Sequence, residues 1–286
     1  MKIIKVFLFT VLILVSSALA LWAQDASSDR VAIPFSDPGK PGLIKAHLIN
    51  GGIVVKGYDG KEVIIEAKPR GHVVGKHKDE MDDEDEKQDK HAGMMRLKAG
   101  GGGLSVEESQ NVMEISVPAW KADIDLTIQV PLNTSLKLRA VNNGGIKVEN
   151  VNGDIEVANV NGDIILSRIA GSAVAQTVNG DVTATFTRLD GKKPLSLITL
   201  NGDVDITIPA TAKVDFKFKI DNHGEIYSDF ELKLQNKSEK TVEDKRGHGG
   251  RYRLKIDKTV FGSINGGGQE ITLKTFNGDI LLRKAK

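Results

Sequence analysis

Aspartates recur at regular spacing through the middle of the chain, where their carboxylates could serve as metal ligands. Asp154, Asp163, Asp181 and Asp203 each follow an Asn-Gly pair directly. Nonapeptide repeats that bind calcium carry Gly-Gly-x-Gly-x-Asp in every unit and so offer several oxygen ligands to each ion. Here a unit has at most one glycine beside one aspartate, and the units at Asn143 and Ala170 have no aspartate. We therefore expect the aspartates to accept hydrogen bonds from amides of their own turns, and we predict no metal site in the repeats.

A second group of candidate ligands lies between residues 76 and 91, which contain eight acids and four lysines. His72, His77 and His91 flank these carboxylates, so a loose divalent-cation site is one interpretation. No Asp-x-Asp-x-Asp-Gly spacing defines a coordination sphere here. A charged stretch with so few apolar residues buries too little surface to become ordered. We therefore interpret residues 76–103, which end in four glycines, as a flexible insertion.

The residue types needed for nucleophilic catalysis are missing or scattered. The chain has no cysteine and no Gly-x-Ser-x-Gly motif. The histidines show no pairing with a nucleophile; they are His47, His72, His77, His91, His223 and His248. Asp and Glu are so numerous that no two stand out as the paired carboxylates of a glycosidase. We expect Trp120 and Tyr58 to pack rather than to stack on sugars. The sequence thus predicts no catalytic residue and no cofactor, with a polysaccharide-active β-helical enzyme as an alternative.

The Asn-Gly pairs belong to a nine-residue repeat. Five consecutive units start at residues 143, 152, 161, 170 and 179; their fourth and sixth residues are apolar, as is the ninth in the first four. Repeats of this kind indicate stacked structural units. We predict that the turns of the stack are formed by Asn143, Gly144, Asn152, Gly153, Asp154, Asn161, Gly162, Asp163, Asn179, Gly180, Asp181, Asn201, Gly202, Asp203, Asn277, Gly278 and Asp279.

The spacing of the repeats predicts the fold class. Two units make eighteen residues, close to the spacing of twenty-two between Asn179 and Asn201, so we expect coils of 18 to 22 residues with two or three short strands each. Successive coils would pair in parallel, about 4.8 Å apart, and align their apolar positions in one interior. The predicted fold is an all-β, single-chain parallel β-solenoid. Because Asn-Gly also signals two-residue hairpins, an antiparallel barrel or sandwich is the alternative.

Alternation of apolar and polar residues with period two predicts further strands outside the repeats. They are residues 43–68, as three short strands of an early coil, and residues 112–118, 122–131, 135–141, 226–234 and 251–256. The last two surround a second polar insertion at 235–250.

The first residues have the features of an export signal. Lys2 and Lys5 precede the apolar stretch 6–15, and small residues offer cleavage sites after Ala20 or Ala23. The apolar stretch is short for a membrane span and no basic cluster follows it, so an uncleaved anchor is the lesser alternative.

These observations divide the chain into three parts: a signal peptide at 1–23, a linker at 24–42, and a β-solenoid domain at 43–286 with flexible insertions at 76–103 and 235–250. The mature protein is expected to be exported, to a periplasm, an outer surface or the medium.

Three segments together resemble the bacterial putative-adhesin family, a domain of unknown function related to the head domains of putative autotransporter adhesins. They are NGGIVVKGYDGKEVIIEA near residue 50, VNGDIEVANVNGDIILSRIAGSAVAQTVNGDV from Val151, and TFNGDILLR near the C-terminus. The resemblance extends over about residues 30 to 286. It implies a secreted or envelope-associated parallel β-solenoid, and the family pattern offers no catalytic residue to carry over.

The expected function is therefore non-enzymatic binding. The 39 basic and 38 acidic residues nearly cancel, which argues against nucleic acid as a partner, because its binding needs a concentrated basic face. We expect the repeat surface to bind an envelope protein or a surface glycan, with no stable membrane span after signal cleavage. The structural alternative is end-to-end self-association into fibres, because solenoid ends expose unpaired strands.

Overall fold

A computed structural model describes residues 29–70, 104–117, 123–189, 191, 193–244 and 252–286 of the 286-residue chain. The predicted signal peptide, the insertion at 76–103, Trp120 and His248 lie outside the described residues. Among the described residues no helix is present, so none could cross a membrane. The predicted all-β class is confirmed.

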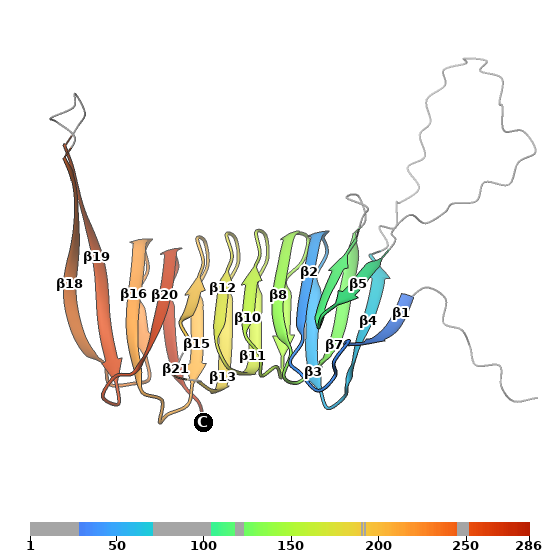
Figure 1. Cartoon of the computed structure of the whole chain (residues 1–286). Coiled ribbons are helices and arrows are strands. Elements are labelled where there is room, and N and C mark those ends of the chain that lie inside the picture. The colour runs from blue at the N-terminus through green and yellow to red at the C-terminus, as the bar shows by residue number, and fades with distance from the viewer. Residues whose placement is uncertain (1–28, 71–103, 118–122, 190, 192, 245–251) are drawn as a thin grey trace, which may run out of the picture.

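Two sheets face one another along an elongated stack (Figure 1). Sheet A has ten strands, in spatial order β1 (Asp29–Pro34), β4 (Glu62–Pro69), β7 (Ile124–Pro131), β3 (Ile53–Tyr58), β9 (Ile146–Glu149), β11 (Ile164–Ala170), β13 (Val182–Arg188), β15 (Val204–Ile208), β21 (Ile280–Lys284) and β17 (Ile226–Ser228). Sheet B has eleven, in spatial order β18 (Lys233–Asp244), β19 (Tyr252–Ile264), β16 (Val214–His223), β20 (Gln269–Asn277), β14 (Leu195–Ile198), β12 (Ala173–Gln176), β10 (Ile155–Ala158), β8 (Ser135–Asn142), β2 (Leu43–Asn50), β6 (Val112–Ser116) and β5 (Ser105–Ser109).

Each nine-residue unit is one strand and one turn. Successive strands alternate between the sheets, so a coil contains two strands rather than two or three. Strands one coil apart pair in parallel and in register: Ile146 lies beside Ile164, Ile164 beside Val182, and Val182 beside Val204. This parallel stack has the predicted solenoid character, and the antiparallel barrel or sandwich is wrong for it.

The core lies between the two sheets because alternate side chains of every strand point inward. The fourth and sixth residues of the units, such as Ile146 and Val148, are buried. The ninth residue behaves differently from unit to unit. Ile169 is fully buried, whereas Val160 and Val178 are 37% exposed. Consecutive units turn at opposite edges of the stack, so the structural repeat is eighteen residues, with two different corners.

Antiparallel strands extend both sheets at one end of the stack and sheet B alone at the other. At one end β4 pairs with β7 and β1 with β4 in sheet A, while β5 pairs with β6 in sheet B. At the other end β19 lies between β16 and β18 and is antiparallel to both. The predicted early coil is present as β2 and β3, but its third strand, β4, turns back against the stack.

The order of coils in space differs from their order in the chain. The coil β20–β21 lies between β14–β15 and β16–β17, although β16 and β17 precede it in sequence. In the same way β2–β3 lies between β6–β7 and β8–β9. Each of these coils therefore fills a space between two others.

Two sequence expectations near the C-terminus differ from the structure. Residues 226–234 are not one strand: β17 belongs to sheet A, and β18 starts at Lys233 in sheet B. Most of the predicted polar insertion at 235–250 is strand as well, because β18 continues to Asp244 and β19 begins at Tyr252. The alternating polar sequence pairs as a long hairpin that extends beyond the other strands (Figure 1). The strand β1 also lies within the predicted linker.

Candidate functional site

One edge of the stack is formed by asparagine turns, and we call it the asparagine edge. Each asparagine side chain donates from Nδ2 to Oδ1 of the asparagine in the neighbouring coil. The bonds run from Asn161 to Asn142 (2.9 Å), Asn179 to Asn161 (2.8 Å), Asn201 to Asn179 (2.9 Å), Asn277 to Asn201 (2.8 Å) and Asn222 to Asn277 (2.7 Å). The side chains thus form a continuous hydrogen-bonded ladder across six coils.

The turn residues Asn143 and Gly144 lie at this edge, but Asn142 provides the ladder contact in their coil. Asn143 has a φ of 62° and is the extra residue that makes this turn one position longer. Residues 142 and 143 are both asparagine. The nine-residue count selects Asn143 as the turn residue, so the sequence pattern did not identify Asn142.

Four of the six ladder asparagines are followed by a glycine whose conformation and contacts exclude a side chain. Gly162 has a φ of 149°, and a Cβ there would lie 2.4 Å from the carbonyl oxygen of Gly144. Gly180, Gly202 and Gly278 repeat this arrangement. L-residues with a Cβ rarely adopt such φ values, so these positions require glycine for both reasons.

The aspartates at this edge bond to the next coil rather than to their own turn. A carboxylate oxygen of Asp163 accepts the amide of Asp181 (2.9 Å), Asp181 accepts that of Asp203 (2.8 Å), and Asp203 accepts that of Asp279 (2.7 Å). The expectation of bonds within each turn is therefore wrong for these aspartates. Stacking places the aspartate amide of the next coil within hydrogen-bonding distance of each carboxylate.

A third, buried column lies behind the same edge. Its members are Asn159, Thr177, Thr199 and Thr275, all less than a tenth exposed. They donate to the carbonyl oxygens of Gly144, Gly162, Gly180 and Gly202 respectively, at 2.8 to 3.1 Å. These buried polar groups are satisfied, and they leave no unpaired group aimed at a ligand.

The turn at Asn152, Gly153 and Asp154 lies at the opposite edge. A Cβ on Gly153 would lie 2.2 Å from the carbonyl oxygen of Thr134. Asp154 accepts from the Ser172 hydroxyl (3.0 Å) and pairs with Lys193 (2.5 Å). Most of the predicted turn residues thus contact neighbouring coils at one edge or the other. Within the described ranges no three His, Asp or Glu side chains lie close enough to hold a metal ion.

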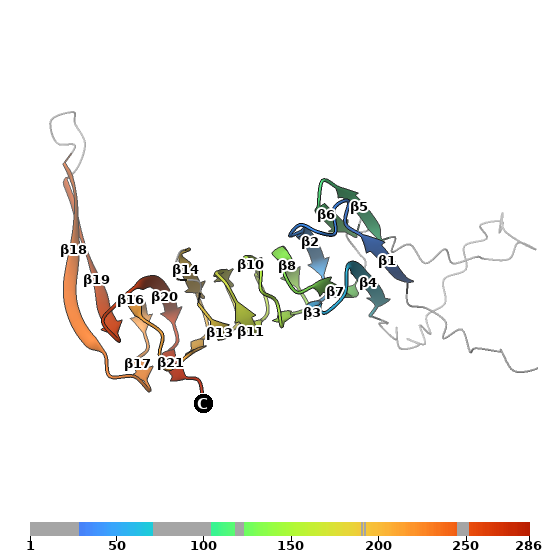
Figure 2. The same cartoon turned by 60° about the horizontal axis from the view of Figure 1, so that its bottom comes forward.

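A cleft of about 290 Å³ lies on the outer face of sheet B, away from both edges. It is lined by outward residues of four adjacent strands, β5, β6, β2 and β8. Figure 2 shows the β5–β6 hairpin rising beside β2 and β8. The polar lining residues are Glu107 and Ser105 from β5, Glu114 and Ser116 from β6, Lys45 and His47 from β2, and Lys137 and Arg139 from β8.

The charges in this cleft are separated by sign. Glu107 lies beside Glu114 in the strand register, and Lys45 lies beside Lys137. A single ion pair, Lys45 to Glu114 at 2.7 Å, links the two halves. Lys137 pairs outward with Glu156 at 2.9 Å, and Arg139 lies 3.8 Å from the same carboxylate. The cleft therefore has an acidic wall and a basic wall.

A shallower groove of about 740 Å³ continues from this cleft across β8, β10 and β12. The two hollows share Lys45 and Lys137. Val174 is 41% exposed on the floor of the groove, and Lys193 and Pro194 line it as well. Together they form a path that runs along the stack axis and could hold an extended ligand.

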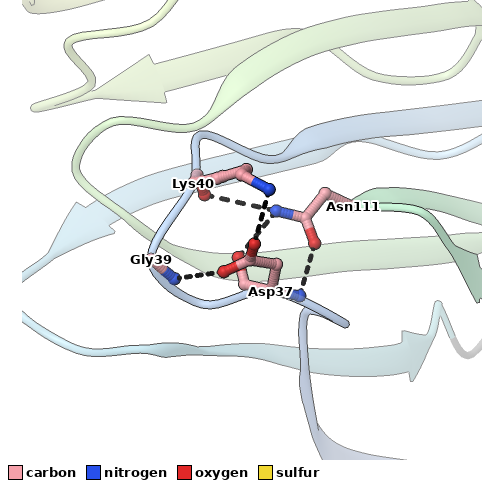
Figure 3. Close-up of polar contacts among 4 residues, drawn as sticks. All are labelled: Asp37, Gly39, Lys40 and Asn111. Carbon is pink, nitrogen blue, oxygen red and sulfur yellow. Dashed lines mark hydrogen bonds and ion pairs between the residues drawn. The ribbon is translucent and has the colours of Figure 1, made fainter.

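The hairpin that forms the acidic wall is held by the loop between β1 and β2 (Figure 3). The Asn111 side chain donates to the carbonyl oxygen of Asp37 (2.7 Å) and accepts the Asp37 amide (2.7 Å). Asp37 also pairs with Lys40 at 2.8 Å. Glu108 on β5 accepts from the Ser36 hydroxyl at 2.7 Å and from its amide at 3.0 Å. We call these contacts the loop clamp.

Two carboxyl groups of the loop clamp have lowered pKa values. The hydrogen bond from Lys40, followed by that from the Gly39 amide, lowers the pKa of Asp37. The hydroxyl and amide of Ser36 lower the pKa of Glu108. Both carboxylates are therefore held in their charged form by the contacts that fix the wall.

The cleft could not be predicted from the sequence, because its residues come from distant segments. A signal is present in retrospect: Ile44-Lys45-Ala46-His47 and Leu136-Lys137-Leu138-Arg139 have the same alternation, with basic residues at the two outward positions. Of the histidines named in the sequence analysis, His47 lies in the cleft, whereas His223 is exposed at the end of β16. The Tyr58 hydroxyl donates to the Glu62 carbonyl oxygen. His72, His77 and His91 lie outside the described residues.

Comparison with known proteins gives one family match. The family model described as Toastrack DUF4097 matches residues 93–259. Among solved structures, a putative cell adhesion protein from Clostridium sporogenes aligns with 91% of this chain and 100% of its own, at 11% identity and a TM-score of 0.43. A putative adhesin from Bacteroides fragilis aligns with 91% of this chain and 98% of its own, at 11% identity and a TM-score of 0.28. No curated protein matches the chain.

Proposed function

The chain belongs to the Toastrack DUF4097 family, and from this premise we propose that it is a non-enzymatic, exported β-solenoid of the putative-adhesin type. It binds an envelope component, either a protein or a surface glycan, in the cleft on sheet B and the groove that continues from it. The export signal predicted from the N-terminal sequence supports a location in a periplasm, at an outer surface or in the medium.

One observation carries the proposal. The polar side chains of the asparagine edge bond to neighbouring coils, whereas those of the cleft include like-charged neighbours within hydrogen-bonding strands. Like charges directly opposite one another destabilise a sheet. Local rules of stability are typically broken at functional sites. The cleft combines a like-charged pair on each wall with a hollow between them, an arrangement that a purely structural role does not explain.

Binding to envelope material from the native host tests the proposal. We expect the labelled protein to bind envelope fractions, and the double substitution Lys137→Glu with Arg139→Glu to weaken binding at least tenfold. The matched control is Lys147→Glu, since Lys147 is exposed on the outer face of sheet A. Equal binding by both variants, or no binding by the parent protein, would overturn the proposal.

Self-association is a second candidate, favoured by the C-terminal end of the stack. Sheet A ends there in the three-residue strand β17, while sheet B continues through the hairpin β18–β19. Leu234 on β18 is 59% exposed. An open strand end with an exposed apolar residue could add a second copy. Sedimentation velocity over a concentration series distinguishes the candidates, because fibres grow with concentration and a monomeric binder does not.

A further inference from the structure

The cleft residues form an ordered array, two rows deep and four strands wide. Register places Glu107, Glu114, Lys45 and Lys137 in one row. The second row contains Ser105, Ser116, His47 and Arg139 in the same strand order. All eight line the cleft. From β5 to β8 the first row changes from two acids to two bases.

The central ion pair leaves the two ends of the cleft free to act on a ligand. Lys45 and Glu114 largely neutralise one another on the floor. Among the described residues neither Glu107 nor His47 has an ion-pair partner, and Arg139 reaches Glu156 only at 3.8 Å. Arg139 is 59% exposed. An uncompensated carboxylate thus stands at one end, and a guanidinium with an imidazole at the other.

We propose that the cleft recognises a zwitterionic ligand, one that carries an ammonium group and an acid group. The acid group binds Arg139 and His47, with the Ser116 hydroxyl as a further donor. The ammonium group binds Glu107 and the second carboxylate oxygen of Glu114, Oε2, because Lys45 contacts only Oε1. This inference rests on the proposed binding role of the cleft and specifies the chemical class of its ligand: a short peptide with free termini.

The dimensions of the cleft fit such a ligand. Neighbouring strands lie about 4.8 Å apart, so β6 and β8 are separated by about 10 Å. An extended peptide spans roughly 3.3 to 3.6 Å per residue, which gives about 10 Å for a tripeptide. Its two charged termini would therefore lie over opposite walls. Charge-assisted hydrogen bonds are among the stronger contacts available to a ligand on an exposed sheet face.

Three tripeptide probes test the proposal on the full chain. Triglycine is zwitterionic, acetyl-triglycine lacks the ammonium group, and triglycine amide lacks the acid group. We expect saturation-transfer NMR to detect triglycine binding, and each blocked form to bind at least tenfold more weakly. Arg139→Gln should weaken triglycine binding but leave the weak triglycine amide signal unchanged. Glu107→Gln should also weaken triglycine binding, but it should leave the weak acetyl-triglycine signal unchanged. Lys147→Gln is the control and should change nothing.

Outcomes separate this inference from the proposed function. Equal binding of all three peptides, or no effect of Arg139→Gln and Glu107→Gln in variants with unchanged circular dichroism and melting, would overturn the zwitterion proposal. If triglycine does not bind at all while envelope material still binds through the cleft, the zwitterion proposal fails and the binding function stands. If triglycine competes with envelope material, both are supported.

Discussion

At the asparagine edge, one asparagine side-chain amide can bond to the coils on both sides of its own. Asn179, for example, donates to Asn161 and accepts from Asn201. A net hydrogen bond contributes roughly 1 kcal/mol to stability, so the ladder is a modest term beside the burial of the aliphatic core. Its larger effect is on register, because the side chains meet only when coils stack without slippage.

The turn glycines give the first prediction. Gly162→Val should lower the free energy of unfolding by about 3 kcal/mol, through a strained φ and a clash with the Gly144 carbonyl. Glu156→Ala is the control on the solvent face, where exposed ion pairs contribute about 0 to 1 kcal/mol. Urea unfolding followed by circular dichroism measures both. Equal midpoints would show that the turn tolerates a side chain.

The asparagines also differ in chemical stability. In an Asn-Gly pair the glycine nitrogen can attack the asparagine side-chain carbon, which releases ammonia and forms a cyclic imide. Within the ladder this nitrogen is occupied: the Gly162 and Gly180 amides donate to the carbonyls of Asn179 and Asn201. Among the described residues neither the Gly153 amide nor the exposed Asn152 side chain has a hydrogen-bond partner.

We therefore predict that Asn152 deamidates faster than Asn161, Asn179, Asn201 and Asn277 in the folded protein at mildly alkaline pH. Peptide mapping by mass spectrometry after incubation measures each site within one molecule. Unfolding in urea should bring the five rates together. Equal rates in the folded state would contradict the protective role of the ladder.

At the scale of elements, the loop between β1 and β2 fixes the hairpin that forms the acidic wall of the cleft. Folded-state pKa values of Asp37 and Glu108 lie below their ordinary values of 3.8 and 4.5. Their stabilising contribution is therefore complete above the ordinary values and is lost as the pH falls through the lowered ones. The loop clamp should be intact at neutral pH and should release in acid.

NMR titration tests the acid release of the loop clamp. The Ser36 and Gly39 amides, which donate to Glu108 and Asp37, should shift with midpoints below 4.5 and 3.8 respectively. Glu108→Gln should abolish the Ser36 transition and leave that of Gly39 in place. Midpoints at or above the ordinary values would mean that the clamp does not hold these carboxylates charged.

Element positions within the repeats could be predicted from sequence because alternation and turn residues are local signals. Ile146 and Val148 point inward for that reason. The edge at which each turn lies could not be predicted, since the motif at Asn152 resembles that at Asn161. Nor could the cleft, because Lys45 and Lys137 meet only after two separate segments stack. Strand β18 was missed because a polar, alternating edge strand has the composition of a loop.

At the scale of the whole molecule, the coil β20–β21 links the central stack to the C-terminal hairpin. It pairs with β14 and β15 on one side and with β16 and β17 on the other. Deleting residues 269–286 should leave β2 to β15 protected from hydrogen exchange and unprotect residues 214–264. Exchange followed by mass spectrometry measures this by segment. Continued protection of 214–264 would show that this region folds without the coil.

The same placement sets a constraint on the nascent chain. Strands β16 and β17 leave the ribosome before the coil that separates them from β14 and β15 has been made. Until then the two early segments must stay apart, because direct pairing between them would occupy the slot that residues 269–284 need. Completion of this end of the protein is thus tied to the arrival of its latest strands, and premature closure is the characteristic error that its folding has to avoid.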